Sequence, residues 1–259
     1  MKVVFWNGIS MSEGLTDYVA AIGAILSLEY NCEVVLGSNY VSNHMLQDCF
    51  YYKNRKEIAH VPYCYIQGST EYYRVLWSMK RNLQGNILEI PMEGVTIVYP
   101  PDVTDKKLFY HEASEVTYYL FDLAGESITT LQSAAEESEL FVVFLPQNEY
   151  KIQKFFHRFS SIIPHAIFVI EEHQRSNRLF YRKIVAEYGI KNKNIVSIPK
   201  SRRYKEVCEE GNLEAFLKNN PAINTDNYNF ISGVRNTARL IHSYCIQKRR
   251  EESRGDKKL

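Results

Sequence analysis

The sequence predicts an α/β protein with a doubly wound, mostly parallel sheet of seven to eight strands and helices on both faces. Three observations support this fold class. Short, nearly continuous apolar runs such as VVFW, LFVVFL and AIFVI alternate with helical segments, as in parallel sheets that are covered on both sides. Proline or glycine residues end several of these runs. The first run leads through a glycine-containing loop into a largely apolar helix, which is a phosphate-binding layout.

The strands are predicted wherever a short apolar run has the length and β-branched content of a buried strand. These runs are residues 2–6, 33–37, 95–99, 116–122, 140–145, 166–170 and 194–198. Pro100, Pro146 and Pro199 stop the third, fifth and seventh runs, because proline cannot donate a hydrogen bond within a sheet.

The helices are predicted from longer segments with helical periodicity between these runs. They are residues 14–30, 41–52, 69–79, 128–138, 149–159, 176–188, 201–209, 212–219 and 227–247. Asn31 and Cys32 form the turn after the first helix, and Gly189 is placed as a C-cap. Right-handed crossovers then place the ligand crevice beyond the carboxyl ends of the strands.

Residues 1–247 are predicted to form a single domain, followed by a charged, flexible tail at 248–259. The tail, KRREESRGDKKL, has six basic and three acidic residues and no apolar face. A solvated, frayed end is the main interpretation. A weak electrostatic contact with a membrane or a partner is the alternative, so any membrane contact is expected to be peripheral.

Composition and net charge argue against several classes of protein. A net charge of +1 argues against general nucleic-acid binding. The five cysteines are odd in number and form no C-x-x-C pair, which favours reduced thiols over a disulfide framework or a zinc site. No apolar run approaches the roughly 18–20 residues that span a bilayer. We therefore expect a cytoplasmic protein.

The glycine-containing loop departs from the P-loop pattern G-x-x-x-x-G-K-[ST]. Aligning Gly14-Leu15-Thr16 with the end of the motif keeps the last glycine and the hydroxyl, but Leu15 stands where lysine contacts the β/γ-phosphates. Ile9 stands where the first glycine would be. The sequence is therefore more informative about fold than about chemistry.

The order of these segments resembles that of the MinD/ParA family of P-loop ATPases. Within it, the chain looks most like the degenerate pilus-positioning branch of TadZ/CpaE-type proteins. The resemblance covers nearly the whole chain and is weakest at 41–94. It is carried by FWNGISMSEGLTDYVAAIGAIL, EVVLGSNY, YYLFDLAGESITTLQSAAEESELFVVFLPQ and AIFVIEEHQRSNRLFYRKIVAEYGIKNKNIVSIP, and by EEGNLEAFLKNN before a long terminal helix.

The resemblance implies a set of candidate site residues. Those expected around a nucleotide are Gly8, Ser10, Ser12, Gly14, Leu15, Thr16 and Gly125. Thr16 and Asp122, the counterpart of the Walker B aspartate, are the expected Mg²⁺ ligands. Ordinary structural roles stay open: Thr16 as a helix cap, Asp122 as a turn residue, and both glycines as backbone accommodations.

Departures from the family limit the expected chemistry. Ser10 and Leu15 stand at the positions of the two P-loop lysines, and no carboxylate occurs from Val34 to Gln47, where the family has an acidic switch residue. Glu171 or Glu172 replaces the adenine-contacting asparagine. Because phosphoryl transfer depends on fixed cations, efficient hydrolysis is not expected.

Three functions stay open from the sequence. The first is a positioning or assembly scaffold for pilus or secretion machinery, with protein partners, a homodimeric state, and weak or no ATPase activity. The second is an active ATP-dependent dimerisation switch that uses Thr16 and Asp122 with Mg²⁺. The third is an unrelated doubly wound enzyme. For the cofactor, two alternatives are equal: ATP with Mg²⁺, or no cofactor at all.

Overall fold

The computed structural model describes residues 1–7, 14–38, 49–50, 95–98, 118–123, 138–173, 178–219, 222–223 and 225–255. In this part of the chain, seven strands form one parallel sheet in the order β3-β2-β4-β1-β5-β6-β7. The strands are β1 (Lys2–Trp6), β2 (Val34–Ser38), β3 (Val95–Val98), β4 (Tyr118–Asp122), β5 (Leu140–Pro146), β6 (Ala166–His173) and β7 (Ile195–Pro199). The predicted doubly wound parallel sheet is confirmed.

The sheet changes winding direction at β1. Strands β2, β3 and β4 lie on one side of β1, and β5, β6 and β7 lie on the other. Such a switch point opens a crevice beyond the strand carboxyl ends, because the connections on the two sides leave in opposite directions. The end of β1 and the end of β4 therefore both lie at the edge where ligands bind in this fold class.

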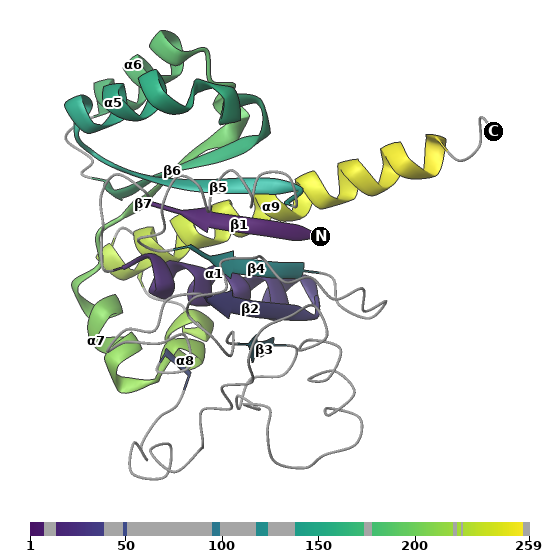
Figure 1. The fold of residues 1–259 in the computed structure, drawn as a ribbon. Helices are drawn as coiled ribbons and strands as arrows, with labels where there is room; N and C mark the ends of the chain where they lie inside the picture. The colour runs from purple at the N-terminus through teal and green to yellow at the C-terminus, as the bar shows by residue number, and fades with distance from the viewer. Residues whose placement is uncertain are drawn as a thin grey trace, which may run out of the picture.

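Helices cover both faces of the sheet (Figure 1). They are α1 (Leu15–Tyr30), α5 (Glu149–Phe159), α6 (Arg178–Tyr188), α7 (Arg202–Glu210), α8 (Leu213–Lys218) and α9 (Asp226–Gly255). Alternate strand residues face alternate layers. Val3 and Phe5 pack with α1, α7, α8 and α9, whereas Val4 and Trp6 pack with α5 and α6.

Helix α1 is central to one layer. Every residue from Leu15 to Leu26 is buried, because β2, β4, α8 and α9 all pack around it. Gly23 allows a close approach to the sheet: a Cβ there would lie 2.6 Å from Leu36 Cδ2. Helix α9 approaches β7 in the same way at Gly233, where a Cβ would lie 2.8 Å from the Ser197 carbonyl oxygen.

Two element ends extend three or more residues beyond the sequence expectations. Strand β6 continues through Glu171 and Glu172 to His173, because Glu171 pairs with Pro146 of β5 and His173 pairs with Pro199 of β7 beyond an irregularity in the β6–β7 register. Helix α9 continues past residue 247 to Gly255, into the segment expected to be a frayed tail. The helix expected at 69–79, residues 128–137 of the one expected at 128–138, and most of the one at 41–52 lie outside the described residues.

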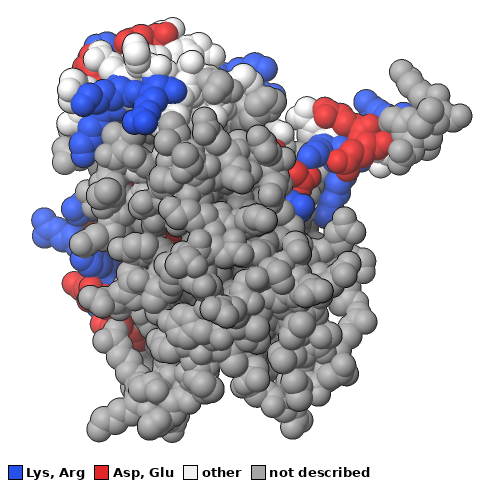
Figure 2. All heavy atoms as spheres, viewed as in Figure 1, with Lys and Arg blue, Asp and Glu red and all other residues white. Residues whose placement is uncertain are grey.

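Polar contacts sustain the extension of α9. Gln247 Nε2 donates to Glu251 Oε1 at 2.9 Å, an i,i+4 pair that supports helices. Lys248 Nζ donates to Glu139 Oε1 at 2.7 Å and so ties α9 to the start of β5. Figure 1 shows the last turns of α9 extending past the sheet, and Figure 2 shows both signs of charge on this extension.

Four basic residues, Arg175, Arg178, Arg182 and Lys183, lie in or just before α6 in the sequence. Arg182 and Lys183 are exposed on α6, and Lys183 forms an ion pair with Glu149 of α5. Figure 2 shows Lys and Arg side chains gathered over this layer. Arg175 lies outside the described residues, and the side chain of Arg178 is not described. The described part therefore agrees with a solvated face.

Candidate functional site

The centre of the candidate site is a contact between α1 and β4. The Thr16 hydroxyl donates a hydrogen bond to Asp122 Oδ2 at 2.6 Å. The two residues are 106 positions apart in the chain, and their exposed fractions are 6% for Thr16 and 0% for Asp122. The fold thus joins the beginning of the first helix to the acidic end of the fourth strand.

Strand pairing fixes the position of Asp122. It is the last residue of β4 and lies opposite Phe5 of β1 and Ser38 of β2. The backbone N–H of Leu123 then donates to the Phe5 carbonyl at 2.9 Å, which holds the strand end against β1. The Asp122 carboxylate therefore lies at the carboxyl edge, beside the switch point.

The start of α1 fixes the position of Thr16. Gly14 is the N-cap residue and its carbonyl accepts from the Tyr18 N–H at 3.2 Å. Thr16 is thus the second residue of the helix, and its hydroxyl binds a carboxylate instead of capping the helix. At Gly14 the nearest described contact of an added Cβ would be Tyr18 Cε2 at 3.6 Å, and φ is −102°, so the described surroundings do not require glycine.

A hydroxyl and a carboxylate at this edge fit Mg²⁺. This ion takes oxygen ligands and is usually bound by one or two carboxylates together with phosphate oxygens. In the structure the Thr16 hydroxyl donates directly to the Asp122 carboxylate, so the two oxygen atoms that would bind the ion already lie next to each other. Thr16 and Asp122 would hold the metal, whose chemical contribution would be neutralisation of phosphate charge.

Leu15 cannot contact the phosphates of a triphosphate as the lysine of the motif does. Its side chain is fully buried and belongs to the apolar cluster of the α1 layer. The position that carries a cation in the P-loop pattern therefore carries a packed core residue here. Four other candidates from the sequence, Gly8, Ser10, Ser12 and Gly125, lie outside the described residues.

Two further buried polar residues lie near the same edge. Asn7 follows β1 and is 1% exposed, and Glu171 of β6 lies opposite Pro146 of β5 and is 6% exposed. Asn7 was not among the sequence candidates. The signal that could have found it is its place as the first polar residue after a buried strand at a switch point.

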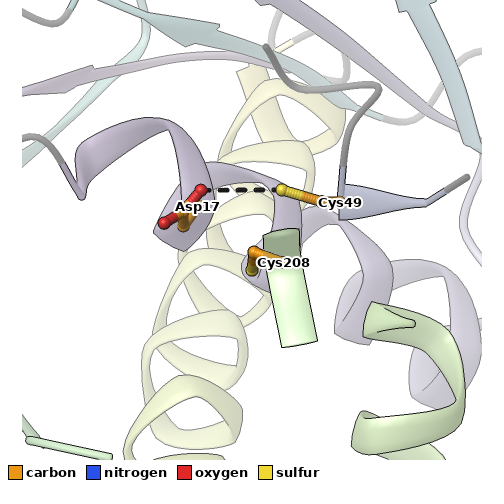
Figure 3. A group of neighbouring side chains, drawn as sticks. All are labelled: Asp17, Cys49 and Cys208. Carbon is orange, nitrogen blue, oxygen red and sulfur yellow. Dashed lines mark hydrogen bonds between the residues drawn. The ribbon is translucent and has the colours of Figure 1, made fainter. Parts of the chain in front are cut away.

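Asp17, which follows Thr16 on α1, contacts a cysteine. It is 7% exposed, and its Oδ1 accepts a hydrogen bond from Cys49 Sγ at 3.6 Å. Cys208 of α7 lies beside them (Figure 3). The Tyr204 hydroxyl, also on α7, donates to the backbone carbonyl of Asp17.

The surroundings of Cys49 and Tyr204 favour their neutral forms. A hydrogen bond with Cys208 and complete burial raise the pKa of the Cys49 thiol. Burial, together with the nearby Cys208 and Asp17, raises the pKa of the Tyr204 hydroxyl. Sequence spacing gave no sign of this cluster, because its members lie on three separate segments.

Among the described helices, none is both long and apolar enough to cross a membrane. No protein-family model matches the chain, and no curated protein matches it in sequence.

Solved structures of similar fold span almost the whole chain. A chain of the MinC:MinD cell division protein complex of Aquifex aeolicus has a TM-score of 0.63 at 12% identity, covering 94% of this chain and 96% of that one. The septum site-determining protein MinD of Pyrococcus horikoshii, complexed with Mg-ADP, has a TM-score of 0.60 at 12% identity, with 90% and 93% covered. A ParA family ATPase from Chlorobium tepidum has a TM-score of 0.59 at 12% identity, with 91% and 98% covered. The chain therefore has the fold of the MinD and ParA ATPases.

Proposed function

We propose that this protein is a MinD/ParA-type positioning protein that serves an assembly machine as an interaction scaffold, with weak or no ATP hydrolysis. The observation that carries the proposal is the contrast between two neighbours on α1. Thr16 keeps its contact with Asp122, whereas Leu15 is packed into the core where the motif has its lysine.

This contrast separates binding from turnover. Phosphoryl transfer needs fixed positive charge around the transferred group, and loss of a single arginine finger costs about 10³–10⁵ in rate. Leu15 supplies no charge at all. A metal held by Thr16 and Asp122 would still attract phosphate oxygens, so weak Mg²⁺-dependent nucleotide binding without efficient hydrolysis is the expected outcome.

The comparisons support the class of function. The Pyrococcus horikoshii protein is complexed with Mg-ADP, and the Aquifex aeolicus structure contains MinD with its protein partner MinC. We infer that this chain binds partner proteins of pilus or secretion machinery, as TadZ/CpaE-type proteins do, forms a homodimer, and works in the cytoplasm with at most peripheral membrane contact.

The test combines calorimetry with a turnover assay. ATP with Mg²⁺ is titrated into the purified full chain, and phosphate release is followed on the same sample. We expect weak heat that disappears in Asp122→Asn and persists in Asp226→Asn, which changes an exposed aspartate in the first turn of α9. Steady multiple turnover by the wild type would overturn the scaffold proposal.

The retained Thr16–Asp122 contact favours one second candidate, an active ATP-dependent dimerisation switch. This candidate requires cations from a partner subunit. It predicts that ATP with Mg²⁺ changes the sedimentation coefficient and that Asp122→Ala abolishes the change. An identical profile with and without ATP would exclude the switch, whereas a dimer independent of ATP fits the scaffold.

A further inference from the structure

We propose that Asp17, Cys49 and Cys208 form a binding site for a thiophilic divalent cation, with Zn²⁺ as the best fit. One ligand atom from each residue lies within 4.8 Å of the other two. The site does not involve the Thr16–Asp122 contact, and the inference goes beyond the proposed function. Its three members come from α1, from the short segment at residues 49–50 and from α7 (Figure 3).

The spacing suits a tetrahedral ion. Zn–S bonds of about 2.3 Å and Zn–O bonds of about 2.0–2.2 Å give a sulfur–oxygen edge of about 3.5 Å in a tetrahedron. The Cys49 Sγ to Asp17 Oδ1 distance is 3.6 Å. An ion could therefore replace the thiol hydrogen without a large movement of either side chain.

The donor set selects the kind of metal. Two sulfur ligands and one carboxylate suit Zn²⁺ better than Mg²⁺ or Ca²⁺, which take oxygen ligands. Three protein ligands leave the fourth position for water, as in zinc sites with an open position. Two thiolates and a carboxylate would exceed the charge of the ion by one, and the positive end of α1 would partly offset this excess because Asp17 lies in its first turn.

Burial makes the cluster more than a set of ordinary core cysteines. Cys49 and Cys208 are 0% exposed and Asp17 is 7% exposed. Buried cysteines commonly act as small apolar residues, but a buried carboxylate is costly unless it is well paired. A cation would add to the contacts that Asp17 already makes and would link the first turn of α1 to α7.

The surrounding packing holds the ligands in place. Helix α7 is capped at its start by Ser201, whose hydroxyl accepts from the Tyr204 N–H at 3.2 Å. The Tyr204 ring lies 4.0 Å from the Phe230 ring of α9 and 6.0 Å from the Tyr18 ring of α1, measured between centroids. With the Tyr204 hydroxyl bound to the Asp17 carbonyl, Cys208 is fixed relative to Asp17 before any metal binds.

The experiment uses the full chain, stripped of metal and kept reduced with a phosphine. Co²⁺ is added first, because thiolate-to-cobalt charge-transfer absorption reports sulfur ligation directly. Zn²⁺ competition then gives the affinity, and X-ray absorption on the zinc form reports its ligand types. We expect saturable cobalt absorption at one ion per chain, displacement by Zn²⁺, and a first coordination sphere of mixed sulfur and oxygen.

Variants assign the ligands. Cys49→Ser and Cys208→Ser should weaken Zn²⁺ binding by more than the roughly 10–100-fold that loss of a supporting partner costs. Asp17→Asn should weaken binding while keeping the thiolate absorption. Cys32→Ser and Cys245→Ser are matched controls, since both cysteines are buried and lie outside the cluster. Circular dichroism verifies that each variant is folded.

Two results would overturn the proposal. The first is the absence of thiolate-to-cobalt absorption in the wild type, which depends on no variant and would leave the cysteines as buried apolar residues. The second is an equal loss of affinity in the Cys32 or Cys245 controls. A negative ATP titration would not bear on this site, so its failure and that of the proposed function are distinguishable.

Discussion

Replacing Thr16 with valine tests the contact on which the candidate site depends. Valine keeps the shape and the β-branch of threonine but removes the hydroxyl that donates to Asp122 at 2.6 Å. Hydrogen bonds to charged groups contribute roughly 1.5–3 kcal/mol, and Asp122 is fully buried, so water cannot replace the lost donor easily. We expect Thr16→Val to lower the free energy of unfolding by about 1.5–3 kcal/mol.

The matched control is Thr16→Ser, which keeps the hydroxyl and loses one methyl group, at a cost of about 0.8 kcal/mol. Unfolding in urea, followed by circular dichroism, gives both free energies from the midpoint and slope. A double-mutant cycle with Asp122→Ala, which removes the acceptor, isolates the pair. If Thr16→Val is as stable as Thr16→Ser, or if the coupling falls below about 0.5 kcal/mol, the contact does not have the assigned strength.

Three other substitutions test separate parts of the structure. Leu15→Lys should lower the free energy of unfolding by more than the roughly 1.5–3 kcal/mol that a buried leucine contributes, because the lysine charge must also be buried. The substitution should restore no ATPase activity. Urea unfolding measures the first effect and phosphate release the second. Burial raises the pKa of Glu139, but the hydrogen bonds from Lys248 and from the Lys2 N–H, together with the positive charges of the N-terminus and Lys248, outweigh burial and hold the pKa below 4.5. Glu139→Gln should therefore cost roughly 0.2–1 kcal/mol at neutral pH, and unfolding at several pH values should show this difference shrinking as pH falls below 4.5. Gly233→Ala should lower the thermal midpoint, because its Cβ would meet the Ser197 carbonyl oxygen at 2.8 Å and overpacking costs about 1–3 kcal/mol.

Each of these has a control and a contradicting result. Leu15→Met keeps the apolar volume, and a stable Leu15→Lys that hydrolyses ATP would show that the loop lacks only its cation. A Glu139→Gln difference that is constant with pH would refute the sign argued above. Gly23→Ala is the control for Gly233→Ala, because its close contact is the flexible end of Leu36. Equal effects of the two substitutions would refute the backbone-contact argument.

Local pattern was sufficient for most secondary-structure elements. Strands buried on both faces must be apolar along their whole length, so VVFW and LFVVFL are recognisable without tertiary information. The pattern failed where a neighbour decides the outcome. β6 continues through two glutamates because Glu171 pairs with β5 and His173 pairs with β7, and α9 continues to Gly255 with help from Glu139 of a distant segment.

The candidate site divides in the same way. The chain by itself determined that a glycine loop follows the first strand and that an aspartate ends the fourth, since both depend on residues adjacent in sequence. Only the tertiary structure decided that Thr16 binds this aspartate, that Leu15 is a core residue, and that Asp17 meets Cys49 and Cys208. The physical reason is that backbone preferences act over a few residues, whereas strand order and helix packing determine which distant side chains are buried together.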